Sequence, residues 1–125
     1  MDVLSPVDGP WLAWSAAALA AAADRAKLVV NPIIYAELSV GYDSAEALEA
    51  ELPASAFERE DIPYEAAFLA GKAFLDYRRR GGLRRSPLPD FFIGAHAAVA
   101  GHTLLTRDSR RYRTYFPRLA LISPD

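Results

Sequence analysis

Short apolar runs alternate along the chain with longer segments in which apolar positions recur every three or four residues. The runs 27–30, 103–106 and 119–122 are too short for helices and predict buried strands. The segments between them have helical spacing. Short strands that alternate with helices are typical of an α/β fold. We therefore expect a three-layer α/β/α sandwich with a mainly parallel sheet.

Capping residues and helix breakers set the predicted boundaries. Asn31 is a good N-cap before Pro32, and Gly41 is expected to end that helix in a left-handed conformation. Residues 43–46, beginning with Asp43, have the spacing of a capping box and open a helix to about Leu52. Further helices are predicted over 11–23, 64–80, 90–101 and 109–115, and a short edge strand over 57–62.

The composition fits one globular domain. The 125 residues are 52% hydrophobic, which is enough for a sizeable core, but the chain is too short for two typical domains. Cysteine is absent, so any metal must be held by oxygen or by the two histidines, and a reducing cytoplasm suits the chain. The most apolar stretch, 11–23, is interrupted by Ser15 and has no basic flank before it. We expect an amphipathic helix there rather than a signal peptide or a membrane span.

Charge is distributed unevenly, although the formal net charge is only −2. Acidic residues concentrate between residues 43 and 65, whereas arginines gather in 78–85 and 107–118. A basic face suits local binding of a polyanion. The alternative for the first arginine cluster is that it complements the dipole at the carboxyl end of a helix.

Three acidic residues that are far apart in the chain each lie next to a buried segment. Glu37 is on a helix that begins after the first predicted strand, Asp90 opens a helix, and Asp108 follows a strand. Ligands of open parallel sheets bind outside the carboxyl ends of the strands, so we expect these side chains to converge. Clustered carboxylates repel unless a cation neutralises them, which indicates Mg²⁺ or Mn²⁺ and phosphodiester hydrolysis. Taken alone, each acid has an alternative structural role: Asp90 as the N-cap of its helix and Glu37 as an exposed helix residue.

The sequence around these acids resembles the PIN-domain nucleases, and most closely the VapC-type toxins of bacterial toxin–antitoxin pairs. Three segments carry the resemblance in the family's order and spacing: the helix with Glu37, then Asp90-Phe-Phe-Ile-Gly-Ala, then Leu104-Leu-Thr-Arg-Asp108. The resemblance implies that Glu37, Asp90 and Asp108 are catalytic residues and metal ligands, and that Thr106 orients a ligand or a water molecule.

The same resemblance implies a metal-dependent endoribonuclease that uses Mg²⁺ or Mn²⁺. Its partners would be an RNA substrate, a cognate antitoxin protein and a second copy of the chain. Arginines would position the RNA backbone beside the acids without setting sequence preference. The candidates for these RNA contacts are Arg79, Arg80, Arg84, Arg85 and Arg107.

One feature of the family is missing at the N-terminus. PIN proteins open with a short apolar strand that ends in an aspartate, and residues 1–5 resemble what normally follows that strand, so Asp2 is no replacement. We therefore expect residues 1–125 to form a single PIN-like domain that is N-terminally incomplete, through a truncation, a downstream start or degeneration. The alternative function is a catalytically impaired protein that only binds an antitoxin or RNA.

The histidines and tryptophans are expected to have structural roles. His96 lies six positions after Asp90, about 240° around the helix, and should be packed or interfacial. His102 lies in a turn before a strand and should be exposed. Trp11 and Trp14 are on adjacent faces of one helix and should pack against the core or a partner.

Overall fold

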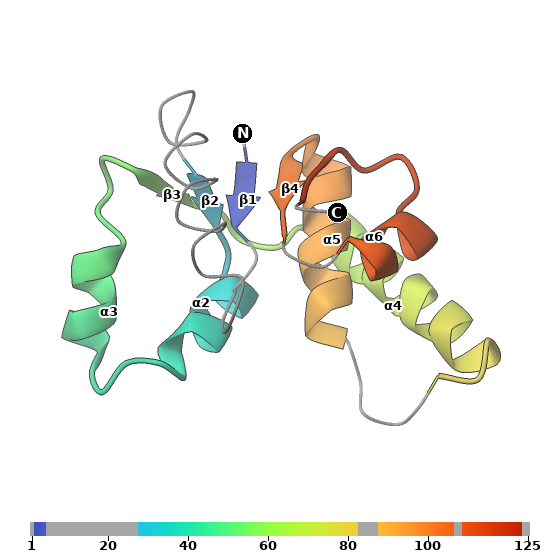
Figure 1. Ribbon diagram of the computed structural model, residues 1–125, viewed down its shortest axis with the longest axis horizontal. Helices are drawn as coiled ribbons and strands as arrows, with labels where there is room; N and C mark the ends of the chain where they lie inside the picture. Colours follow the sequence, from blue (N-terminus) through green and yellow to red (C-terminus); the bar gives the residue numbers. More distant parts are fainter. Residues whose placement is uncertain (1, 5–27, 83–87, 107–108, 124–125) are drawn as a thin grey trace.

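A five-stranded sheet forms the middle of the molecule in the computed structural model, which describes residues 2–4, 28–82, 88–106 and 109–123 (Figure 1). The strand order is β3-β2-β1-β4-β5, and every neighbouring pair is parallel. The predicted α/β class and parallel sheet are confirmed. The strands are β1 Asp2–Leu4, β2 Leu28–Val30, β3 Phe57–Arg59, β4 Thr103–Leu105 and β5 Leu121–Ile122.

The helices described are α2 Pro32–Ser39, α3 Ala45–Glu51, α4 Tyr64–Arg79, α5 Leu88–Ala100 and α6 Arg110–Tyr115. Among them, none is both long and apolar enough to cross a membrane. The predicted helix over 11–23, with Trp11 and Trp14, lies outside the described residues.

The centre of the sheet is occupied by β1, a strand that we did not predict. Asp2 is in register with Leu28 of β2 on one side and with Thr103 of β4 on the other. Residues 2–4 therefore form a strand at the centre of the sheet, although we expected the opening strand of the family to be missing. The residue that follows β1 in the sequence is Ser5, so an aspartate does not directly follow this strand.

The core joins residues of β2 and β4 with residues of all the described helices. All three residues of β2 are buried, as expected for a parallel strand with both faces covered. The buried positions of α4 are the small residues Ala66, Ala70 and Ala73, which let its backbone approach α5 closely. This packing positions the first turn of α5.

Several helix ends differ from the prediction by one or two residues. Gly41 has no positive φ; α2 already ends at Ser39, and the Gly41 amide donates to the Leu38 carbonyl at 3.1 Å. The N-cap of α3 is Ser44 rather than Asp43, because the Ser44 hydroxyl accepts the hydrogen bond from the Ala47 amide. Helix boundaries shift by this amount when two neighbouring residues are both good caps.

Candidate active site

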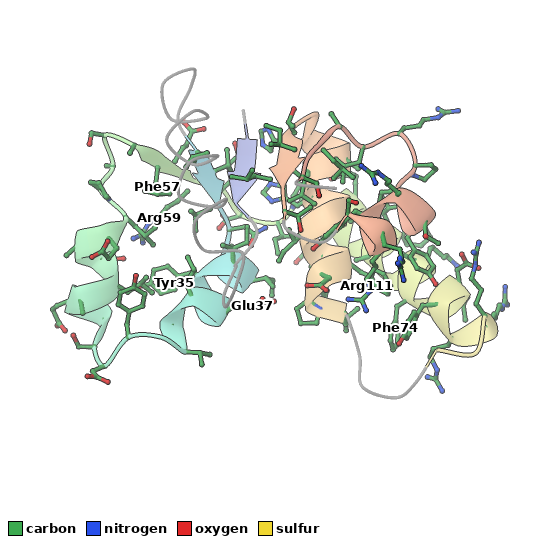
Figure 2. All side chains as sticks on the ribbon, viewed as in Figure 1. Tyr35, Glu37, Phe57, Arg59, Phe74 and Arg111 are labelled. Carbon is green, nitrogen blue, oxygen red and sulfur yellow. The ribbon has the colours of Figure 1, made fainter. Side chains whose placement is uncertain are left out.

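Glu37 extends from α2, the helix that starts directly at the carboxyl end of β2. The predicted cap is confirmed: Asn31 Oδ1 accepts a hydrogen bond from the Ile34 amide at 2.9 Å, and Pro32 occupies the first turn. Ile34 is fully buried and anchors the helix against the core. In Figure 2, Glu37 lies on the side of α2 that faces the start of α5.

Asp90 lies in the first turn of α5, where the helix dipole favours a negative charge. The helix begins at Leu88, so the prediction that Asp90 is its N-cap is wrong. The next residue, Phe91, is fully buried and makes edge-on ring contacts with Tyr115 at 5.1 Å and Tyr77 at 5.8 Å. This aromatic cluster determines where the Asp90 carboxylate is presented.

The structure brings Glu37 and Asp90 close enough for their charges to interact. The pKa of the Glu37 carboxyl lies above its usual value, first because the side chain is partly buried and then because the negative charge of Asp90 opposes its ionisation. Carboxylates in this situation gain from a bound cation, because the cation removes the repulsion. Oxygen ligands of this kind fit Mg²⁺ or Mn²⁺.

Arg111 of α6 is a member of this site that we did not predict. Its Nη1 donates to Asp90 Oδ2 at 2.6 Å, and both side chains are partly exposed. The guanidinium therefore supplies a positive charge on one oxygen of the carboxylate. No local pattern in the sequence signals this pair, because Asp90 lies 21 residues before Arg111.

Thr106 directly follows β4 and is buried. Its backbone amide donates to the Ile122 carbonyl at 3.0 Å, which fixes the chain at the carboxyl end of the strand. The third predicted ligand, Asp108, lies outside the described residues, as do Arg84, Arg85 and Arg107.

Two of the predicted RNA contacts, Arg79 and Arg80, lie at the end of α4 and are exposed. This end of α4 is on the same side of the molecule as the start of α5 (Figure 1). Arg80 pairs with Asp76 at 3.1 Å and lies 5.4 Å from the ring of Tyr115. Part of the arginine cluster therefore has a structural role as well.

A second group of titratable residues gathers around Glu60, which directly follows β3. His96 Nε2 and His102 Nε2 lie 3.1 and 2.8 Å from the same oxygen, Glu60 Oε1. The prediction that His96 is packed is confirmed, whereas the prediction that His102 is exposed is wrong, because both are buried. Glu60 was missed, although an acid at the carboxyl end of a strand is the same signal that drew attention to Asp108.

The family profile of the PIN domain matches residues 12–117, which is most of the sequence. The chain belongs to the PIN-domain family. Proteins of this family are generally nucleases, and these nucleases generally use a divalent metal. No match was found among curated protein sequences.

Solved structures with the same fold match nearly the whole chain. VapBC2 from Rickettsia felis, bound to a DNA fragment from its promoter, shares 20% identity with full coverage of both chains and a TM-score of 0.67. VapBC-1 from nontypeable Haemophilus influenzae shares 17% identity over 98% of each chain, with a TM-score of 0.69. FitAcB from Neisseria gonorrhoeae shares 16% identity over 99% of this chain and 98% of that one, with a TM-score of 0.61.

Proposed function

We propose that this PIN-domain protein is a metal-dependent endoribonuclease and the toxin component of a toxin–antitoxin pair. The observation that carries the proposal is that Glu37 of α2 and Asp90 of α5 lie near enough for the Asp90 charge, after burial, to raise the pKa of Glu37. The similarity to the VapBC and FitAcB structures supports the toxin assignment.

We propose that Glu37, Asp90 and Asp108 hold a hard divalent cation, Mg²⁺ or Mn²⁺, because carboxylate oxygens suit such an ion. When bound, such an ion activates a water molecule and stabilises charge on the phosphate. Arg111 donates a hydrogen bond to one oxygen of Asp90, Oδ2. Thr106, at the end of β4, lies two residues before Asp108 and would orient a ligand or a water molecule.

The arginines at the end of α4 supply the charge that attracts RNA to this edge. We propose that Arg79 and Arg80, together with Arg84, Arg85 and Arg107, contact the phosphate backbone. Contacts of this kind set the register of the RNA rather than its sequence. Their loss would weaken binding and flatten its dependence on salt.

We propose an antitoxin and a second copy of the chain as protein partners. The similarity to the structures of VapBC2, VapBC-1 and FitAcB supports the antitoxin. On α4, Tyr64, Phe68 and Leu75 are exposed, the first two by 93% and 69%. At 100° per residue they lie within about 40° of one another and form an apolar stripe suited to self-association.

Cleavage of labelled RNA by the purified chain tests the enzymatic proposal. We expect cleavage with Mg²⁺ or Mn²⁺, none with EDTA, and a loss of cleavage in Glu37→Gln. Glu46→Gln, which changes an exposed acid on α3, should cleave like the unchanged chain. Metal-independent cleavage, or full activity in Glu37→Gln, would overturn the assignment of the site.

Two observations favour the second candidate function, a protein that binds RNA or an antitoxin without cleaving. Ser5, not an aspartate, follows β1, and Arg111 already neutralises part of the Asp90 charge. The same assay separates the two functions when RNA binding is measured in parallel. Retained binding without cleavage at any metal concentration would favour the second candidate.

A further inference from the structure

Glu60, His96 and His102 come from three separate elements and place their polar atoms together in the interior. Glu60 follows β3, His96 is in the middle of α5, and His102 precedes β4. One carboxylate oxygen and two ring nitrogens, one from each residue, all lie within 4.8 Å of one another. His96 is only 1% exposed, so burial is the main reason why the pKa of its imidazole is lowered and its neutral form is favoured.

Two of the three separations between the ligand atoms are close to those of a tetrahedral metal site. Ligands at about 2.0–2.1 Å from a tetrahedral Zn²⁺ ion are separated from one another by about 3.3 Å. The two nitrogen–oxygen distances here are 3.1 and 2.8 Å. Both nitrogen–oxygen separations are therefore within about 0.5 Å of the spacing at a zinc ion.

The donor set distinguishes this cluster from the acidic site. Two imidazoles and one carboxylate suit Zn²⁺ and related transition ions, whereas Mg²⁺ prefers oxygen ligands alone. We propose that Glu60, His96 and His102 form a second metal site, for Zn²⁺ or a similar transition ion. This inference does not rest on the proposed nuclease function.

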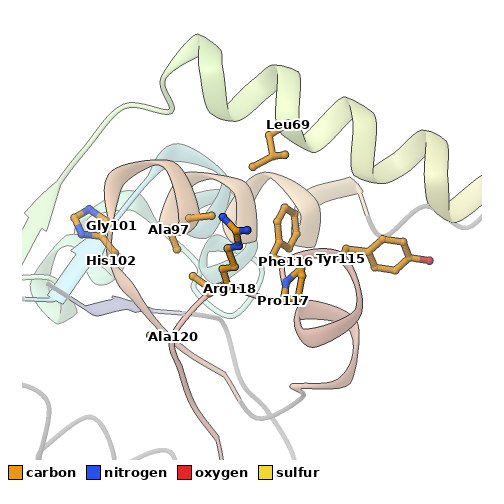
Figure 3. A pocket seen from close by; sticks show the side chains of 11 residues that line it. Leu69, Ala97, Gly101, His102, Tyr115, Phe116, Pro117, Arg118 and Ala120 are labelled. Carbon is orange, nitrogen blue, oxygen red and sulfur yellow. The ribbon is translucent and has the colours of Figure 1, made fainter.

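The site has a route to solvent on the side of Glu60. The Glu60 side chain is 28% exposed and lines a cavity of about 370 Å³ together with Asn31 and Tyr35. His102 also lines a separate cavity of about 370 Å³ beside α5 and the end of α6 (Figure 3). A water molecule entering from the Glu60 side would complete four-fold coordination.

Asn31 determines how tightly this site holds a metal. Its Oδ1 accepts from the Ile34 amide, so its Nδ2 faces His96 Nδ1 at 3.0 Å and donates to it. Neutral His96 then carries its proton on Nε2, the atom needed for the metal. Metal binding at Nε2 displaces that proton. If the proton moves to Nδ1, the Asn31 amide has to turn, because Nδ1 then donates instead of accepting. A carboxylate at position 31 would accept both from the Ile34 amide and from a protonated Nδ1.

Calorimetric titration of the full chain with ZnCl₂, in millimolar MgCl₂ to occupy the acidic site, tests the proposal. We expect one Zn²⁺ per chain, with affinity reduced at least tenfold in His102→Gln and raised about tenfold in Asn31→Asp. Asp90→Asn serves as the control and should leave the zinc affinity within about twofold. Bound Co²⁺ should give the visible absorption bands of a tetrahedral site with nitrogen ligands.

Each result decides for or against the site. No saturable zinc binding, or binding that is lost in Asp90→Asn but retained in His102→Gln, would overturn the proposal and leave a hydrogen-bonded structural cluster. If His102→Gln does not fold, Glu60→Gln replaces it, because its side chain is partly exposed and its amide still accepts a hydrogen bond. Unchanged zinc affinity in a folded Glu60→Gln variant would likewise count against the site.

Discussion

Glu37 and Glu60 are both partly buried beside the same sheet, yet their carboxyl groups respond to their surroundings in opposite directions. The pKa of Glu37 is raised, by burial and then by the charge of Asp90. Burial also raises the pKa of Glu60, but hydrogen bonds and charge interactions, first with His102 and then with His96, outweigh it and leave the pKa below its usual value. Neighbouring groups, rather than burial alone, decide which carboxylate is stable as an anion.

The two regions differ in what a bound metal would change. The acidic region, with Glu37 and Asp90, gains stability when a cation enters, because two carboxylates repel. The imidazole cluster, Glu60 with its two histidines, already satisfies its buried polar atoms by hydrogen bonds. A metal ion bound there would replace these hydrogen bonds. Only an ion that binds imidazole nitrogen strongly, such as Zn²⁺, would compensate for their loss.

The largest effect that separates the two regions is expected for Asp90→Asn. The change removes the charge of a proposed metal ligand. It does not alter the N-cap of α5, because that helix begins two residues before Asp90. We expect RNA cleavage to fall by more than about a hundredfold, since even indirect contacts to a metal are worth 10–100-fold. Cleavage rates at saturating Mg²⁺ and circular dichroism provide the measurement.

Asp76→Asn is the matched control, because Asp76 also pairs with an arginine but lies on α4. It should keep most of the cleavage activity. An active Asp90→Asn protein would remove Asp90 from the site and leave Glu37 without its partner.

The second effect concerns close packing, which the acidic region needs to hold α6 and Arg111 in place. A Cβ atom at Gly94 would lie 2.7 Å from the Phe116 ring and 3.0 Å from the Tyr112 ring. Gly94→Ala should therefore lower the free energy of unfolding by about 1–3 kcal/mol, as overpacked cores do. Urea unfolding measures this.

Gly71→Ala is the control, because a Cβ at that position of α4 meets nothing within 4 Å. It should stabilise the protein by about 0.5–1 kcal/mol, through the better helix propensity of alanine. Stabilisation by both substitutions would contradict the close approach of Gly94 to the Phe116 and Tyr112 rings.

Local sequence patterns predicted the elements but not all the contacts between them. Asn31 with Pro32 marked the start of α2 correctly, because a cap is a short-range hydrogen bond. The central position of β1 was missed, since three residues have no periodicity to read. The burial of His102 was also missed, because its partner Glu60 is 42 residues away. The ion pair of Arg111 with Asp90 depends on how α6 packs, which one sequence does not encode locally.

The third effect is a difference in pH dependence, which sharpens the comparison directly. Because the folded-state pKa of Glu37 is raised, the folded protein binds the extra proton, and the contribution of Glu37 to stability falls as pH rises above its usual pKa of 4.5. For Glu60 the folded-state pKa is lowered, so its contribution is present above 4.5 and is lost as pH falls through the folded-state value.

Both effects are measured as the change of the unfolding free energy with pH, above and below pH 4.5, in EDTA to keep the protein free of metal. Glu37→Gln should remove the loss of stability that occurs as the pH rises above 4.5. Glu60→Gln should reduce the loss of stability that occurs as the pH falls below 4.5. Each change should be a fraction of the roughly 1.4 kcal/mol that one pKa unit represents, because both side chains are partly exposed. The same slope change in both variants would contradict the opposite shifts.

The smallest effect is expected for Arg111→Ala, which tests whether the guanidinium competes with the metal. Arg111 and Asp90 are partly exposed, so their ion pair is worth about 0.2–1 kcal/mol. Without it Asp90 keeps its full charge for a cation, and Mg²⁺ affinity should rise by about two- to fivefold, measured by calorimetry. Arg80→Ala is the control, because its pair with Asp76 does not involve the site acids. Zn²⁺ affinity should stay the same in both variants, since neither contacts the imidazole cluster. A fall in Mg²⁺ affinity in Arg111→Ala would mean that Arg111 instead orients Asp90 for the metal.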